Sequence, residues 1–233
     1  MAYTCRQKGI HLVVYAAVNA NPMKVERMRS LGAEVRLFGN DFDTAKEQAR
    51  QVAKQEGLVM IEDGLAVETI EGAGTIASEL LAIGTLDAVL IPLGNGALFN
   101  GMATVLKALS PGAKRIAVQA AGAPAMADSW KAGRLISYAS VNTIADGIGV
   151  RLPIAEALSD MQSLADDVVT VTEASILAAM KLIHSNVGIV PEPSAAVGVA
   201  AILEDCNRFA GLRTATVLCG GNLTDEQMKT WLG

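Results

Sequence analysis

The chain has 233 residues, of which 51% are hydrophobic, so it can bury a sizeable core in one large domain or two small ones. Its 19 Lys and Arg residues against 24 Asp and Glu residues give a formal charge of −5 without basic runs, which argues against nucleic acid as a partner. Three cysteines without a C-x-x-C pair indicate reduced thiols in a cytoplasmic protein, and no apolar run reaches the roughly 18 to 20 residues that a membrane span needs.

Short apolar runs alternate with helical patterns along the whole chain. Strand, helix, strand order with short links predicts right-handed crossovers and mostly parallel sheets, an α/β fold with three αβα layers. A weak break near Glu62-Asp63-Gly64 divides a smaller domain, residues 1–63, from a larger one, residues 64–233. The predicted strands are residues 11–17, 34–38, 58–61, 88–93, 115–120, 167–171 and 214–219.

Three helices carry clear start and stop signals. The helix over 42–56 has Asp41 as its N-cap and Gly57 just past its end. Thr172 is the expected cap of a helix that starts at 173, and a helix over 22–31 begins with Pro22. Residues 2–8 resemble the second half of a helix closed by a glycine, so we expect the sequence to begin within an element.

A glycine turn, Gly94-Asn95-Gly96-Ala97-Leu98, follows the apolar run 88–93 and opens a helical pattern. It lacks the Lys-Ser/Thr pair of a P-loop, and Phe99 stands where a dinucleotide fingerprint needs its third glycine. Two interpretations remain. The turn aims backbone N–H groups and a helix dipole at a single phosphate monoester, or it is only a tight strand-to-helix connection.

A second glycine pair, Gly220-Gly221, follows the last predicted strand, with Cys219 at the strand tip. Ligands of open α/β sheets bind outside the carboxyl ends of the strands, where both glycine turns are expected. The two turns are therefore candidates to line one pocket. Cys219 would then offer its thiol to the ligand, although a small buried cysteine is the alternative interpretation.

Several stretches together resemble the pyridoxal-phosphate enzymes of the tryptophan synthase β-subunit fold (fold type II), in the threonine/serine dehydratase and serine racemase branch. They occur in the family's order and cover nearly the whole chain: residues 21–39, 70–80, 91–111, 143–150, 166–173, 192–203 and 218–222. The resemblance implies that the turn from Gly94 to Leu98 holds the phosphate of pyridoxal 5′-phosphate and that Cys219 faces the pyridine nitrogen. It also implies that Glu192 is either a carboxylate near the ring or a structural acid.

The same resemblance implies the reaction and the assembly. Dehydratases of this kind convert a 3-hydroxy amino acid to a 2-oxo acid and ammonia by β-elimination, and a neutral partner such as Cys219 at the pyridine nitrogen favours that outcome. Family members are commonly dimers or tetramers. In racemase-like members a Glu and an Asp bind a divalent cation, but the matching positions here are Gln119 and Ala125, so we expect no metal site.

Two motifs of the family are missing from the sequence. The Schiff-base lysine belongs to an S-[FY]-K-x-R-G-A type motif and the substrate-carboxylate loop to an S-x-G-N motif, and neither is present among the nine lysines or elsewhere. We therefore expect this chain to correspond to the C-terminal two-thirds of a dehydratase-like subunit. It would have no catalytic lysine of its own, and apolar faces of its sheet and helices would be left uncovered. The alternative is a catalytically inactive remnant that binds phosphate or pyridoxal 5′-phosphate without a covalent bond.

Overall fold

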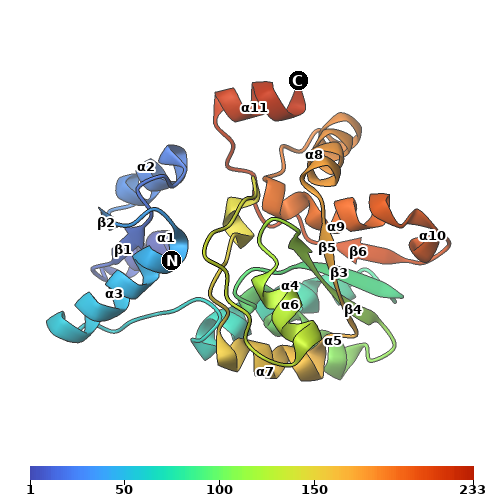
Figure 1. Cartoon of the computed structure of the whole chain (residues 1–233), viewed down its shortest axis with the longest axis horizontal. Helices are drawn as coiled ribbons and strands as arrows, with labels where there is room; N and C mark the ends of the chain where they lie inside the picture. Colours follow the sequence, from blue (N-terminus) through green and yellow to red (C-terminus); the bar gives the residue numbers. More distant parts are fainter. The chain divides into compact units, whose positions relative to one another are not determined.

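The computed structural model describes all 233 residues, which form two compact units, Met1–Glu62 and Asp63–Gly233 (Figure 1). All paired strands in both units are parallel, and helices connect successive strands. The predicted α/β fold with parallel sheets is therefore confirmed. None of the helices has both the length and the apolar character needed to cross a lipid bilayer.

The first unit contains two parallel strands and three helices, whose ends follow the predicted signals. Asp41 caps the third helix by accepting a hydrogen bond of 2.7 Å from the Thr44 backbone N–H, and Gly57 ends it with φ 66°. Gly9 ends the first helix with φ 62°, a conformation that glycine adopts without steric cost. The elements are α1 (Ala2–Lys8), β1 (Val13–Ala16), α2 (Pro22–Ser30), β2 (Glu34–Leu37) and α3 (Phe42–Glu56).

One predicted strand of this unit is wrong, because residues 58–61 form no strand. A strand needs a neighbour whose backbone groups pair with its own. The sheet here consists of β1 and β2 only, so residues 58–61 have no such neighbour. Their apolar side chains remain at the surface, where Val59 is 91% exposed.

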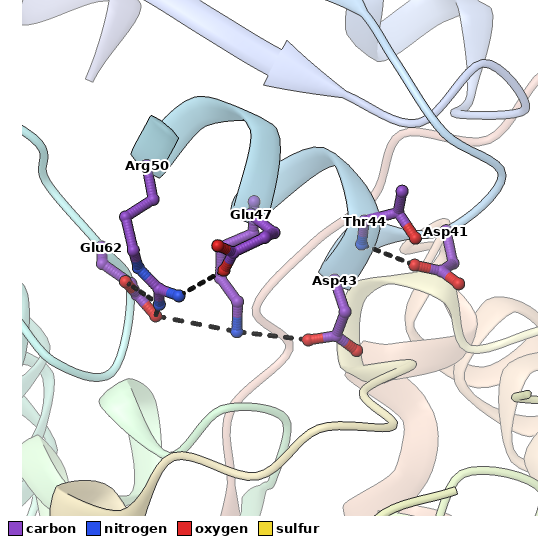
Figure 2. A network of polar contacts seen from close by, with 7 residues as sticks. Asp41, Asp43, Thr44, Glu47, Arg50 and Glu62 are labelled. Atoms are coloured by element: carbon purple, nitrogen blue, oxygen red, sulfur yellow. Dashed lines mark hydrogen bonds and ion pairs between the residues drawn. The ribbon is translucent and has the colours of Figure 1, made fainter. Parts of the chain in front are cut away.

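A network of charged side chains holds Glu62, which follows residues 58–61, against α3 (Figure 2). Arg50 donates to both carboxylate oxygens of Glu62, at 2.9 and 2.7 Å, and to Glu47 Oε2 at 2.6 Å. Lys46 Nζ lies 3.7 Å from Glu62 Oε1 and 3.2 Å from Asp43 Oδ1. The hydrogen bonds that Arg50 donates to the Glu62 carboxylate raise the pKa of the Arg50 guanidinium, because they favour its charged form.

The second unit is built on a parallel sheet of order β5-β4-β3-β6. Thr172 caps the helix after β5 as predicted, accepting a hydrogen bond from the Ser175 N–H at 3.2 Å. The elements are α4 (Val67–Leu81), β3 (Ala88–Pro92), α5 (Ala97–Leu109), β4 (Lys114–Ala120), α6 (Ala125–Ala132), the 3₁₀ turn η1 (Asp146–Ile148), α7 (Ala155–Leu164), β5 (Asp167–Val171), α8 (Glu173–Val187), α9 (Pro193–Glu204), α10 (Cys206–Phe209), β6 (Thr214–Thr216) and α11 (Asp225–Leu232).

The central strand β3 shows why this sheet has helices on both faces. All five of its residues are buried. Val89 and Ile91 pack in one apolar cluster with α4, α5, α6 and α7, whereas Ala88 and Leu90 pack in a second cluster with α8 and α9. Because alternate side chains of a strand point to opposite faces, the sheet is the middle of three layers, as the αβα prediction requires.

Candidate functional site

The glycine turn joins the carboxyl end of β3 to the start of α5. Gly96 is the N-cap of α5 with φ 104°, and no side chain caps this helix. The N–H groups of the first turn therefore have no side-chain acceptor, and the helix dipole places partial positive charge beside them. Such a helix end is suited to bind an anion, phosphate above all.

The turn opens into a pocket of about 180 Å³ that lies within the second unit. Every residue that the sequence singled out for a site lines this pocket. These residues are Gly94, Asn95, Gly96, Ala97, Leu98, Glu192 and Cys219. The two glycine turns, more than a hundred residues apart, are thus brought to the same edge of one parallel sheet.

Glu192 links the start of α9 to the loop of residues 218–222 in the wall of the pocket. It is the N-cap of α9 and is buried, and its Oε1 accepts hydrogen bonds from the backbone N–H and the side-chain Nδ2 of Asn222, at 2.8 and 2.7 Å. Its own N–H donates to the Gly220 carbonyl at 2.9 Å. A Cβ at Gly220 would lie 2.8 Å from Glu192 Cδ, so a larger residue there would displace the Glu192 carboxylate. Glu192 therefore holds the 218–222 loop against α9 while lining the pocket.

Cys219 lies in that loop rather than in a strand. The strand predicted over 214–219 ends at Thr216, because the pairing of β6 with β3 ends at Leu90. The thiol of Cys219 is exposed and lines the pocket. The alternative interpretation of Cys219 as a small buried residue is wrong, and a ligand in the pocket can reach its sulfur.

The pocket is also lined by residues that were not predicted as site residues, among them Asp63, Gly147 and Ser194. Gly147 and Ser194 belong to stretches that carry the family resemblance, 143–150 and 192–203, but no spacing in the sequence marks them as neighbours. The structure places them in contact, because a Cβ at Gly147 would lie 2.8 Å from Ser194 Oγ. Their proximity depends on the tertiary fold.

The chemistry of the pocket fits a small, polar, phosphate-bearing ligand. Asn95 Oδ1 and Ser194 Oγ are buried without a hydrogen-bond partner, although both residues line the pocket. A buried polar group in that state costs about 1–3 kcal/mol unless a ligand or water bonds it. No Lys, Arg or His lines the pocket, so backbone N–H groups and the dipole of α5 are the available anion-binding groups. These features match the phosphate and polar ring substituents of pyridoxal 5′-phosphate.

The two positions expected to lack metal ligands lie in β4 and at the start of α6. Gln119 is the penultimate residue of β4 and fully buried, and its Oε1 accepts a hydrogen bond of 2.9 Å from the Ala127 N–H. Ala125, the first residue of α6, has no oxygen ligand to offer in its side chain. That no divalent cation is held here stays a prediction.

We predict that Glu192→Ala lowers the free energy of unfolding of the second unit by about 2 kcal/mol, because both Asn222 donors lose their acceptor. Glu192→Gln keeps an oxygen at that position and is expected to cost less than about 1 kcal/mol. Urea unfolding followed by tryptophan fluorescence measures both, since Trp130 and Trp231 lie in this unit. Equal losses in the two variants would contradict the assigned contact.

Comparison with known proteins gives a consistent result. The family model "Pyridoxal-phosphate dependent enzyme" matches residues 1–220. The L-threonine ammonia-lyase of Thermotoga maritima is 33% identical over 216 residues, which are 92% of this chain and 54% of that protein. Among solved structures, the processed form of threonine deaminase isoform 2 from Solanum lycopersicum has a TM-score of 0.90 at 28% identity, covering 98% of this chain and 64% of that one. Maize serine racemase has a TM-score of 0.89 at 28% identity, with 98% and 71% covered.

The chain spans about half the length of the curated relatives that it matches. The resemblance noted in the sequence is confirmed by the family match and by the structural neighbours, which share its arrangement of parallel sheets. With a match that extends over all but the last 13 residues and relatives among both threonine dehydratases and serine racemases, the chain belongs to the family of pyridoxal-phosphate dependent enzymes.

Proposed function

We propose that this chain is the phosphate-holding part of a pyridoxal-phosphate dependent lyase that acts on a 3-hydroxy amino acid such as threonine or serine. The observation that carries the proposal is the convergence of Gly94 to Leu98, Glu192 and Cys219 on one pocket at the carboxyl edge of the sheet. The activities named for its relatives support it, since several are threonine dehydratases or ammonia-lyases.

Each part of the pocket has a stated role in this proposal. The N–H groups at the start of α5 bind the phosphate, and the Cys219 thiol faces the pyridine nitrogen as a neutral partner. Glu192 keeps the Cys219 loop in place through Asn222. Pyridoxal 5′-phosphate, when bound, withdraws electrons from the α-carbon of an amino acid. The substrate loses its α-proton and its β-hydroxyl, which leave together as one water. Hydrolysis of the resulting enamine then consumes one water and yields a 2-oxo acid and ammonia.

The lysine that bonds covalently to the cofactor is, in this proposal, supplied from outside these 233 residues, as is the loop that binds the substrate carboxylate. Residues 1–63 belong to the smaller domain of the two-domain fold and residues 64–233 to the larger one. The working enzyme is a cytoplasmic homo-oligomer, a dimer or a tetramer. Its partners are small amino acids.

A second candidate function is non-covalent binding of phosphate or pyridoxal 5′-phosphate without turnover. The observation that favours it is that none of the nine lysines lines the pocket. In that case the chain keeps the phosphate site of the family and lacks the covalent chemistry.

A chimaera separates the two candidates. We would place the segment of the T. maritima enzyme that precedes its matched region before Met1 of this chain, and measure ammonia and 2-oxo acid release from L-threonine and L-serine. The lyase proposal predicts release of both products in equal amounts. A chimaera that binds the cofactor but releases neither product would contradict it and favour the second candidate. Conversion of L-serine to D-serine without ammonia would assign a racemase instead.

A further inference from the structure

From Pro193 to Leu203, helix α9 contains only one polar side chain, that of Ser194. Ser194 is 4% exposed, and its hydroxyl is buried without a hydrogen-bond partner. Alanine would fill this position with a better helix propensity and would leave no hydroxyl unsatisfied, a state that costs folding free energy. Packing within α9 therefore gives no reason for a serine at this position.

The location of Ser194 gives that reason. Ser194 is the second residue of α9 and lines the same pocket as Glu192 and Cys219. The nearby Glu192 carboxylate accepts two hydrogen bonds from Asn222, and the Ser194 hydroxyl is left without an acceptor. A hydroxyl in this state gains a hydrogen bond when a ligand in the pocket supplies one.

Ser194 reaches the pocket from a different wall than the phosphate turn. The turn opens α5, whereas Ser194 belongs to α9, and the 3₁₀ turn η1 touches both. A Cβ at Gly147 in η1 would lie 2.8 Å from Ser194 Oγ, and a Cβ at Gly94 would lie 3.3 Å from Ile148 Cα in η1. A phosphate bound by the N–H groups of α5 therefore leaves the Ser194 hydroxyl to the rest of the ligand.

We propose that Ser194 is a further binding residue of this pocket, whose hydroxyl donates a hydrogen bond to an acceptor on the ring-bearing part of the ligand and not to its phosphate. The inference rests on the proposed function in one respect, that the ligand is an aromatic ring carrying a phosphate ester. It does not depend on the reaction that follows binding.

This assignment gives stability and affinity opposite signs. In the free chain the unsatisfied hydroxyl destabilises the second unit, whereas in the complex the same hydroxyl adds to affinity. A serine with a structural role behaves differently, because its removal lowers the stability of the free chain. Measuring both quantities in one variant therefore separates a ligand-binding serine from a structural one.

The test is Ser194→Ala in the 233-residue chain, with two probes titrated by calorimetry. Pyridoxamine 5′-phosphate carries both the ring and the phosphate, and the variant should bind it about tenfold more weakly than the parent does. Inorganic phosphate has no ring, so its affinity should be unchanged. The melting temperature of the free variant should be at least as high as that of the parent.

Thr216→Val is the matched control. The Thr216 hydroxyl is likewise buried without a hydrogen-bond partner, and it lies against Gly198 of the same helix, α9. Thr216 does not line the pocket. Valine has nearly the same shape, so this variant should also be at least as stable as the parent, and it should bind both probes with unchanged affinity.

Unchanged affinity of Ser194→Ala for pyridoxamine 5′-phosphate would overturn the inference and leave the proposed function standing. Equal losses for both probes, or a lower melting temperature, would assign Ser194 a structural role and overturn it as well. A parent chain that binds neither probe would contradict the proposed function itself. Weaker binding of pyridoxamine 5′-phosphate by Ser194→Ala in a chain that supports no ammonia release would leave this inference intact and contradict only the reaction.

Discussion

Replacing Gly96 by alanine is expected to weaken binding of pyridoxal 5′-phosphate by about 30-fold. Gly96 has φ 104°, a conformation that costs an L-residue about 2 kcal/mol, which corresponds to about 30-fold in a dissociation constant. An added Cβ would also lie 3.2 Å from Ala157 Cβ and 3.4 Å from Asn100 Nδ2. The variant turn would relax to a negative φ and turn its N–H groups away from the phosphate. Calorimetric titration of both proteins measures the difference.

The control for this prediction is Gly133→Ala. Gly133 also has a positive φ, 65°, but it ends α6, lies outside the pocket and has no atom within 4 Å of an added Cβ. In Gly133→Ala the cost of the positive φ falls on folding alone, so this variant should lose stability without losing affinity. Only Gly96→Ala should lose affinity for the cofactor. An unchanged affinity in Gly96→Ala would show that the phosphate is bound elsewhere.

The largest effect on stability is expected from Gly101→Ala, which should destabilise the second unit by about 3 kcal/mol. Gly101 lies in α5 where α4 crosses it. A Cβ there would lie 2.2 Å from the Ile70 carbonyl oxygen and 2.9 Å from the Gly74 nitrogen. Neither backbone atom can move aside without shifting α4, so the two helices would have to separate and expose apolar surface. The free energy of unfolding in urea, followed by tryptophan fluorescence, measures the loss.

Gly72→Ala tests whether that loss comes from the helix contact. Gly72 lies within α4, has no positive φ and has no atom within 4 Å of an added Cβ. Alanine is the better helix former by about 0.5–1 kcal/mol, so this variant should be slightly more stable than the parent. A loss in Gly72→Ala as large as that in Gly101→Ala would contradict the assignment of the effect to the contact between α4 and α5.

The pocket at the glycine turn could be predicted because its features are local in the sequence. A short apolar run followed by Gly94-Asn95-Gly96 indicates a strand, a turn and a helix. The structure has β3 ending within one residue of the predicted strand and α5 starting at Ala97, directly after the turn. Ligands of such folds bind at the carboxyl ends of parallel strands, so the sequence alone predicted that this turn and Cys219 line the same pocket. Capping residues such as Asp41 likewise act within a few positions of their own helix.

The features that could not be predicted depend on partners distant in the sequence. Residues 58–61 have the composition of a strand, but whether they form one depends on a neighbouring strand that the sheet of this unit does not provide. Ser194 lines the pocket only because α9 begins beside Gly147. The charged network that ties Glu62 to Arg50 also has no signature in the sequence beyond common surface residues.

The central claim is that the pocket around Gly94 to Leu98 holds the phosphate of the cofactor. Its most direct test is hydrogen exchange of the 233-residue chain with and without pyridoxamine 5′-phosphate, which carries the same phosphate and ring but no aldehyde that could react with surface lysines. We predict slowed exchange at residues 94–100 and 218–222, competition by inorganic phosphate, and no such protection in Gly96→Ala. Protection confined to other parts of the chain, or equal protection in Gly96→Ala, would contradict the account.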